Sequence, residues 1–193
     1  MIIGFGHIAR VGKTTAADIV ATNYGFEVRS FAGPLKAWAY QTNPIVLQGQ
    51  VAGNVGVGKG RLQHQVQSCG GWDGAKKATA EGREVREFLQ RAGVAAREVF
   101  GEDFWVKTLL DGIRPCDDAV IDDVRFPNEC AAIHWRGGLV VRVTRPNYHP
   151  LNDHESETAL LDYDGWDYEL KNDGTLQDLE KKVTKMMKDL GLD

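Results

Sequence analysis

The stretch that most constrains the fold is Gly4–Thr15, which reads GFGHIARVGKTT and follows the apolar start of the chain. Ile3 and Phe5 predict a short buried strand, and Ile19 and Val20 have the spacing of an apolar helix face. Strand, glycine-containing turn and helix then occur in the order that a phosphate-binding loop requires. The N–H groups at the start of a helix, together with the helix dipole, favour a polyphosphate at that point.

Two residues of this loop have predicted roles. Lys13 would reach the outer phosphates as a point charge, and the Thr14 hydroxyl would complete the ligand shell of a Mg²⁺ ion. The usual loop has four residues between its two glycines, whereas five residues separate Gly6 from Gly12. Either the loop is one residue longer, or His7 occupies the place of the first glycine, and the sequence leaves both alternatives open.

Composition limits the class of protein. The 193 residues suit one α/β domain with a small insertion, and 42% hydrophobic with 26% charged residues is ordinary for a soluble globular chain. A net charge of −4 argues against duplex nucleic acid as the main partner. The three cysteines lie far apart, which argues against a disulfide framework. Without an apolar run of about 18 residues or a cleavable leader, we expect a cytoplasmic protein with no membrane partner.

The rest of the chain predicts alternating strands and helices. After a first helix that ends near residue 24, we expect strands over 26–31, 119–121, 139–143 and 166–170, and helices over 34–39, 82–100, 103–110, 127–135, 154–161 and 175–190. Asp123 and Arg125 come just after the buried 119–121 strand. Since open α/β sheets hold their ligands at the carboxyl ends of strands, both are candidate functional residues by location.

Basic residues gather on the helix predicted after residue 82. Arg83, Arg86, Arg91 and Arg97 surround its apolar stripe, and the rigid fork of an arginine suits two phosphate oxygens at once. A solvated basic face is the alternative interpretation. Lys36, one turn into the helix that begins at 34, could likewise face an anion or remain a solvated surface lysine.

Between residues 43 and 80 the periodicity is lost, because eight glycines interrupt every pattern. A long stretch of this kind inside a compact domain is usually a functional lid or a flexible insertion. Val55–Gly60 resembles a second phosphate loop, but no strand precedes it and no apolar helix follows. We therefore interpret it as flexible loop.

Several stretches taken together resemble one family, the deoxynucleoside monophosphate kinases of tailed bacteriophages, within the P-loop kinase superfamily. The resemblance depends on the order and spacing of GHIARVGKTT, SFAGPLK, REFLQRAG with REVFGEDFW, IDDVRFPNE, GGLVVRVTRP, HESE and NDGTLQDLE. It implies an α/β, P-loop NTPase-type three-layer fold with a parallel central sheet. In that picture residues 1–193 form a single domain that includes a flexible insertion over 43–80 and a lid over 144–161.

The resemblance also implies an activity. ATP, with Mg²⁺, would donate its γ-phosphoryl group to a deoxynucleoside monophosphate (dNMP), giving the diphosphate and ADP. The residues that would bind ATP are Arg10, Gly12, Lys13, Thr14 and Thr15, with Thr14 also the metal ligand. Those that would bind the acceptor are Lys36, Arg86, Gln90, Trp105, Arg125, Asn128 and Glu129. The catalytic residues would be Lys13, Arg86, Asp123 and Arg145.

Three hypotheses concern the roles of the catalytic residues. Arg86 fixes the acceptor phosphate in line, Asp123 positions an arginine or a metal-bound water, and Arg145 arrives with a closing lid. The sequence leaves open the bases accepted, a homodimer as a further assembly, and a viral origin that would make the location the host cytoplasm. It also leaves two rival functions, a P-loop kinase of another small acceptor such as a nucleoside or coenzyme precursor, and a non-catalytic nucleotide-binding regulator.

Overall fold

The computed structural model describes residues 1–47, 59–76, 80–150 and 155–192. The chain forms two compact units. The sheet unit comprises Met1–Phe31 and Val106–Asp193, and the helical unit comprises Ala32–Trp105. The phosphate-loop motif lies in the sheet unit, while the arginine-rich helix lies in the helical unit.

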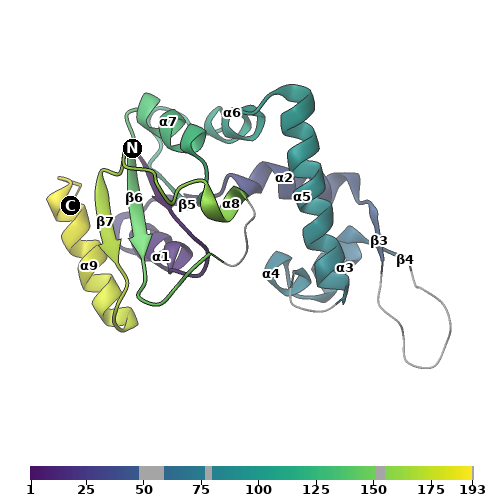
Figure 1. Ribbon diagram of the computed structural model, residues 1–193, viewed down its shortest axis with the longest axis horizontal. Coiled ribbons are helices and arrows are strands. Elements are labelled where there is room, and N and C mark those ends of the chain that lie inside the picture. The colour runs from purple at the N-terminus through teal and green to yellow at the C-terminus, as the bar shows by residue number, and fades with distance from the viewer. Residues whose placement is uncertain (48–58, 77–79, 151–154, 193) are drawn as a thin grey trace. The chain divides into compact units, whose positions relative to one another are not determined.

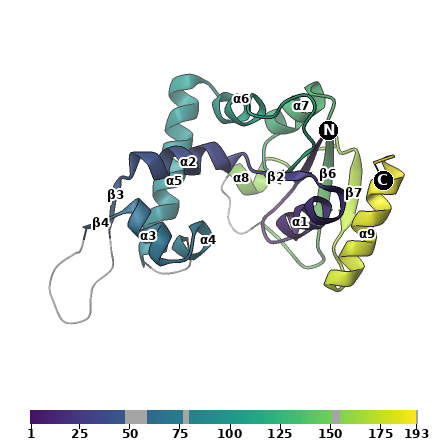
Figure 2. The same cartoon turned by 180° about the vertical axis from the view of Figure 1, so that it is seen from behind.

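A five-stranded parallel sheet forms the centre of the sheet unit, with the strand order β2-β5-β1-β6-β7. The strands are β1 (Ile2–Gly6), β2 (Glu27–Arg29), β5 (Ala119–Val124), β6 (Leu139–Thr144) and β7 (Tyr168–Lys171). All residues of β1 are buried, as expected for a central strand that is covered on both faces. Figures 1 and 2 show the sheet from opposite sides. The predicted parallel sheet is therefore confirmed.

Helices cover both faces of this sheet. One face carries α1 (Lys13–Tyr24) and α9 (Leu176–Asp189), and the other carries α6 (Phe104–Leu110) and α7 (Pro127–Trp135). Alternation along β1 explains the two layers of core, because successive side chains of a strand point to opposite faces. Ile3 and Phe5 pack with the α1 and α9 side, and Ile2 packs with the α6 and α7 side. The three-layer α/β fold that the sequence predicts is thus confirmed.

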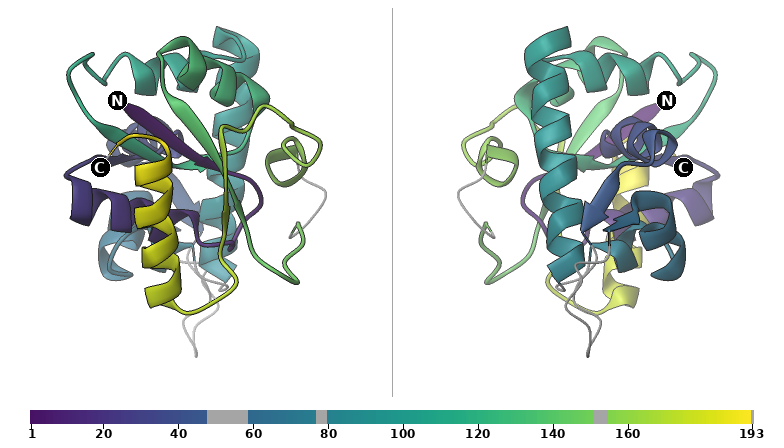
Figure 3. Two further views of the ribbon diagram at one scale, coloured as in Figure 1. Left: turned by 90° about the vertical axis from the view of Figure 1, so that its left-hand side faces the viewer. Right: turned by 90° about the vertical axis from the view of Figure 1, so that its right-hand side faces the viewer.

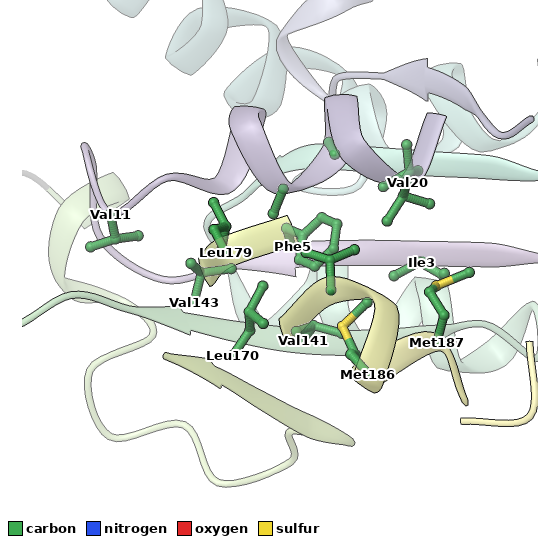
Figure 4. Close-up of a cluster of buried hydrophobic side chains, with 14 of the residues drawn as sticks. Ile3, Phe5, Val11, Val20, Val141, Val143, Leu170, Leu179, Met186 and Met187 are labelled. Carbon is green, nitrogen blue, oxygen red and sulfur yellow. The ribbon is translucent and has the colours of Figure 1, made fainter. Parts of the chain in front are cut away.

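The α9 side of the core is built from three elements that lie far apart in the chain. Figure 4 shows Phe5 of β1 and Val141 of β6 beside Met186 of α9, and all three side chains are buried. The helix has a long polar face and a buried stripe made of Leu179, Val183, Met186 and Met187. Its N-terminus is capped by Thr175, whose hydroxyl accepts a hydrogen bond from the Asp178 N–H.

The helical unit is organised around α5 (Ala80–Phe100), which Figure 3 shows as one uninterrupted helix. It packs with α2 (Ala32–Thr42), and Val85 and Leu89 of α5 share a buried cluster with Ala39. At the edge of this cluster the rings of Trp38 and Phe88 lie parallel, with centroids 6.4 Å apart. The helix predicted over 82–100 is therefore present and longer than expected.

The block over 43–80, predicted as a flexible insertion, is described over residues 43–47, 59–76 and 80. Its described part contains an antiparallel pair and two short helices, namely β3 (Ile45–Leu47), β4 (Lys59–Arg61), α3 (Leu62–Ser68) and α4 (Trp72–Ala75). Leu62, Val66 and Ala75 are buried in the core of the helical unit, so these apolar residues hold α3 and α4 against that core. The part of Val55–Gly60 that precedes Lys59 lies outside the described residues.

Two further differences concern the ends of elements. The strand predicted over 119–121 continues to Val124, because Val124 is buried although Asp122 and Asp123 before it are polar. The helix predicted over 154–161 is shorter and forms α8 (Glu155–Thr158), while residues 151–154 of the predicted lid lie outside the described residues. None of the helices in the described part of the chain combines the length and the apolar character needed to cross a membrane.

Candidate active site

The loop between β1 and α1 resolves the question of spacing. His7 has a φ of 102°, a left-handed conformation that glycine favours and other residues rarely adopt. His7 thus takes the backbone position of the first glycine, and four residues separate it from Gly12. The loop has the usual length, and the first of the two alternatives, a loop with one extra residue, does not apply.

The end of the loop is held by a residue from the far end of the chain. Gly12 precedes α1 with a φ of 104°, and a Cβ atom there would lie 2.4 Å from Asn172 Nδ2. That Asn172 Nδ2 donates a hydrogen bond of 2.9 Å to the carbonyl oxygen of Val11. Asn172 is buried and follows β7. The sequence indicates only a turn at this position, because the contact spans 161 residues.

Lys13 is the first residue of α1, and its side chain turns back to the loop. Its Nζ donates hydrogen bonds to the carbonyl oxygens of His7, at 2.9 Å, and Ile8. The residue is only 6% exposed. Burial lowers the pKa of Lys13 from 10.5 to about 7, and the nearby charge of Arg125 adds to this effect. Glu157, Asp123 and Asp122 only partly offset this effect, so the amine is suited to a further anion.

Thr14 meets a carboxylate from the neighbouring strand β5. Its hydroxyl donates a hydrogen bond of 2.8 Å to Asp122 Oδ2. A hydroxyl and a carboxylate are hard oxygen ligands that suit a Mg²⁺ ion which keeps most of its waters and also binds phosphate oxygens. No group of three or more His, Cys, Asp and Glu side chains that could hold a metal occurs among the described residues. The candidate predicted from the sequence is the next residue, Asp123, and not Asp122.

Asp123 has a different set of contacts. Its two carboxylate oxygens accept hydrogen bonds from the Ser30 hydroxyl, at 2.6 Å, and from the Phe31 N–H, at 2.7 Å. Ser30 and Phe31 lie between β2 and α2, at the point where the chain leaves the sheet unit. Asp123 therefore holds this connection, and its predicted role toward an arginine or a metal-bound water stays a prediction.

Arg125 and Glu157 form an ion pair beside the loop. Arg125 Nη1 contacts Glu157 Oε1 and also donates to the Ser156 carbonyl oxygen at 3.1 Å. The other oxygen, Glu157 Oε2, accepts a hydrogen bond of 3.1 Å from the backbone N–H of Ala9. Burial acts to raise the pKa of Glu157, but Arg125, the Ala9 N–H and Lys13 together lower it. A charged carboxylate thus lies against the loop.

The predicted acceptor residues that follow Arg125 belong to the start of α7. Glu129 Oε2 accepts hydrogen bonds from the N–H groups of Arg125, at 2.6 Å, and Phe126, at 3.1 Å. Glu129 therefore satisfies two N–H groups at the helix start. Burial raises its pKa to about 8. Asn128 lies in the first turn of the same helix and is half-buried.

Three other predicted residues of the sheet unit are exposed. Arg10 and Thr15 lie in the loop and the first turn of α1. Arg145 follows β6, the strand next to β1 in the sheet, and its guanidinium carbon lies 4.9 Å from the centroid of the Tyr148 ring. The carboxyl ends of parallel strands lie at the same edge of a sheet. Arg145 therefore follows β6 at the edge where the phosphate loop follows β1.

The remaining predicted residues lie in the helical unit. Lys36 lines an open cavity of about 490 Å³ together with Tyr40, Gln41 and Trp72. Arg86 and Gln90 are exposed on α5, and Arg86 donates a hydrogen bond to the Lys76 carbonyl oxygen.

Trp105 is half-buried, and its Nε1 donates a hydrogen bond of 3.1 Å to the Gly93 carbonyl oxygen. Both residues belong to the helical unit. The sheet unit itself brings together Lys13, Thr14, Arg125 and the two residues that the sequence analysis did not single out, Asp122 and Glu157. The meeting of this group with Lys36, Arg86, Gln90 and Trp105 stays a prediction.

Comparisons with known proteins give one family match and several similar proteins. A family model described as deoxynucleotide monophosphate kinase matches residues 62–183, more than half of the chain. A relative from Acanthamoeba polyphaga mimivirus, provisionally named a deoxynucleotide monophosphate kinase, is 28% identical over 180 residues, or 89% of this chain and 88% of that protein. Shikimate kinase from Aquifex aeolicus aligns over 100% of this chain and 99% of its own, with a TM-score of 0.46 and 11% identity. Dephospho-CoA kinase from Campylobacter jejuni aligns over 98% and 96%, with a TM-score of 0.43 and 14% identity.

Proposed function

The chain belongs to the deoxynucleotide monophosphate kinase family, and from this premise we propose that it phosphorylates deoxynucleoside monophosphates with ATP. It is a phosphotransferase that acts on nucleotides. The proposed reaction moves the γ-phosphoryl group of ATP to the 5′-phosphate of a dNMP and yields the diphosphate and ADP. The observation that carries the proposal is the loop after β1, where Lys13, Thr14 and Asp122 gather at the start of α1.

Phosphoryl transfer needs positioning and charge stabilisation more than covalent chemistry. In the proposed mechanism the N–H groups of the loop and the start of α1 hold the phosphates of ATP, and the Lys13 ammonium binds their outer oxygens. Thr14 and Asp122 would hold Mg²⁺, which neutralises charge on the phosphates when bound. The acceptor phosphate already carries negative charge near neutral pH, so the reaction requires no general base.

The proposal also names residues for the acceptor. We assign its phosphate to Arg86 and Lys36, because guanidinium and ammonium groups match phosphate oxygens. The cavity beside Lys36 offers the rings of Tyr40 and Trp72 for a base. Gln90, Trp105, Arg125, Asn128 and Glu129 complete the proposed acceptor set, with Asp123 and Arg145 as further catalytic residues.

The place of action that we propose is the cytoplasm, where ATP and deoxynucleotides are available. This proposal follows from the substrates and from the family.

An acceptor panel tests the function. Purified protein is incubated with Mg²⁺-ATP and each of the four dNMPs, the ribonucleoside monophosphates, nucleosides and coenzyme precursors, and ADP release is measured. We expect turnover with at least one dNMP. Turnover confined to a nucleoside or a coenzyme precursor would favour the rival kinase, and tight ATP binding without any turnover would favour the non-catalytic regulator.

A further inference from the structure

The carboxylate of Glu157 lies at the place where the proposed function puts a phosphate. It accepts a hydrogen bond from the Ala9 N–H, an amide of the loop itself, and pairs with the Arg125 guanidinium. The side chain is only 9% exposed, and Lys13 is near enough to lower its pKa. One loop N–H group and one guanidinium therefore bind this anionic group, and the Lys13 amine lies close enough to act on its charge.

The same three groups are what a phosphate oxygen would require. A backbone N–H in a phosphate loop and a guanidinium each recognise an oxyanion, whether it belongs to a carboxylate or to a phosphate. Two anions cannot share these donors, because like charges in a partly buried site repel strongly. A bound polyphosphate and the Glu157 carboxylate therefore exclude each other.

We propose that Glu157 is an internal competitor of the nucleotide, an acidic latch that occupies the phosphate loop until the phosphates of ATP displace it. The inference rests on the proposed function, because the displacing ligand is the triphosphate of a nucleotide. Displacement has a second effect, since Arg125 makes two contacts with α8, to Ser156 and to Glu157. Release of α8 leaves the Arg125 guanidinium available to a phosphate oxygen.

The element that carries the latch is small. The helix α8 has four residues, and so short a helix has little stability of its own. Its position depends on contacts such as those of Ser156 and Glu157 with Arg125 and Ala9. An anion that replaces these contacts can therefore move α8 without unfolding the sheet.

The test measures equilibrium binding and requires no turnover. Wild-type protein and Glu157→Gln are titrated with a non-hydrolysable ATP analogue and, separately, with inorganic tripolyphosphate. The amide keeps the size of the side chain and removes the charge that competes, so we expect both probes to bind about tenfold more tightly to the variant, as for the loss of one charged hydrogen bond. Glu155→Gln, an exposed residue of the same helix, is the matched control and should leave both affinities unchanged.

Equal or weaker binding of the two probes to Glu157→Gln would overturn the latch, as would a gain for the ATP analogue without one for tripolyphosphate. If Glu157→Gln does not fold, Glu157→Asp replaces it, because the shorter side chain withdraws the carboxylate from the Ala9 N–H and should tighten binding of both probes. Binding to Glu157→Asp that is no tighter than to the wild type contradicts the inference equally. Failure of the proposed function is a separate result, namely probe binding without phosphorylation of any dNMP in the acceptor panel.

Discussion

Lys13 shows how much of the site depends on one residue and its surroundings. Its position after Gly12 is read directly from the sequence, because the glycine–lysine–threonine order has a mechanical reason. Its two bonds to loop carbonyl oxygens and its lowered pKa could not be read in the same way. The lowered pKa results from burial and from Arg125, which lies more than a hundred residues further along the chain. The sequence therefore predicted that a lysine stands at this position, but not its protonation state.

A proton should accompany ATP binding to Lys13. With a pKa of about 7, the amine is mostly neutral at pH 8, and phosphate oxygens beside it should restore the ammonium. Calorimetric titration of a non-hydrolysable ATP analogue at pH 8, in two buffers of different ionisation enthalpy, should show an uptake approaching one proton. Lys13→Met should abolish most of that uptake. Equal heats in both buffers for the wild type would contradict the prediction.

Glu129 should make stability depend on pH. Its pKa rises from 4.5 in the unfolded chain to about 8 in the folded protein because of burial. The folded state therefore binds more protons between these values, and the contribution of Glu129 is present below pH 4.5 and is lost as the pH rises through 8. Urea unfolding should show that Glu129→Gln gains stability relative to the wild type between pH 5 and pH 8. The exposed Glu155→Gln should show no such gain. If the unfolding free energies of Glu129→Gln and the wild type depend on pH in the same way, the raised pKa of Glu129 is contradicted.

At the scale of elements, helices and strands could be predicted where nearby residues in the sequence mark their beginning and end. The helix over 127–135 is found with its predicted bounds, because Pro127 favours its first turn and Gly137 the left-handed turn after it. The elements of the 43–80 block were missed, because their few apolar residues are ordered by contacts with α5 rather than by a period of their own. Asp122 and Glu157 were missed for a similar reason, since their partners Thr14 and Ala9 are 108 and 148 residues away.

The junction of loop and helix should not tolerate a side chain at Gly12. Gly12→Ala combines a φ of 104° with a Cβ atom 2.4 Å from Asn172 Nδ2, so we expect it to cost roughly 2 to 3 kcal/mol of unfolding free energy and to weaken ATP binding. Gly25→Ala, after the other end of α1, has a φ of 76° and no atom within 4 Å. This control should cost about 1 kcal/mol and leave ATP binding unchanged. Urea unfolding and analogue titration check both variants, and similar costs would show that the Asn172 contact yields easily.

At the scale of the whole molecule, Arg86 should affect the acceptor and not ATP. The phosphate loop belongs to the sheet unit, and Arg86 belongs to the helical unit. We expect Arg86→Ala to raise the KM for the dNMP by about tenfold to a hundredfold, as for the loss of a charged hydrogen bond, with the Kd of the ATP analogue unchanged. Arg83→Ala, another exposed arginine of α5, is the control and should change neither. An Arg86→Ala enzyme with a normal KM and kcat would show that the arginines form only a solvated face.

Two neighbouring residues of β5 have partners on quite different parts of the chain. Asp122 meets Thr14 at the start of α1, and Asp123 holds Ser30 and Phe31, after which the chain enters the helical unit. One peptide bond thus separates the contact with the proposed metal ligand from the anchor of the connection. A cation that moved the end of β5 on binding would therefore also displace the residues after which the chain enters the helical unit.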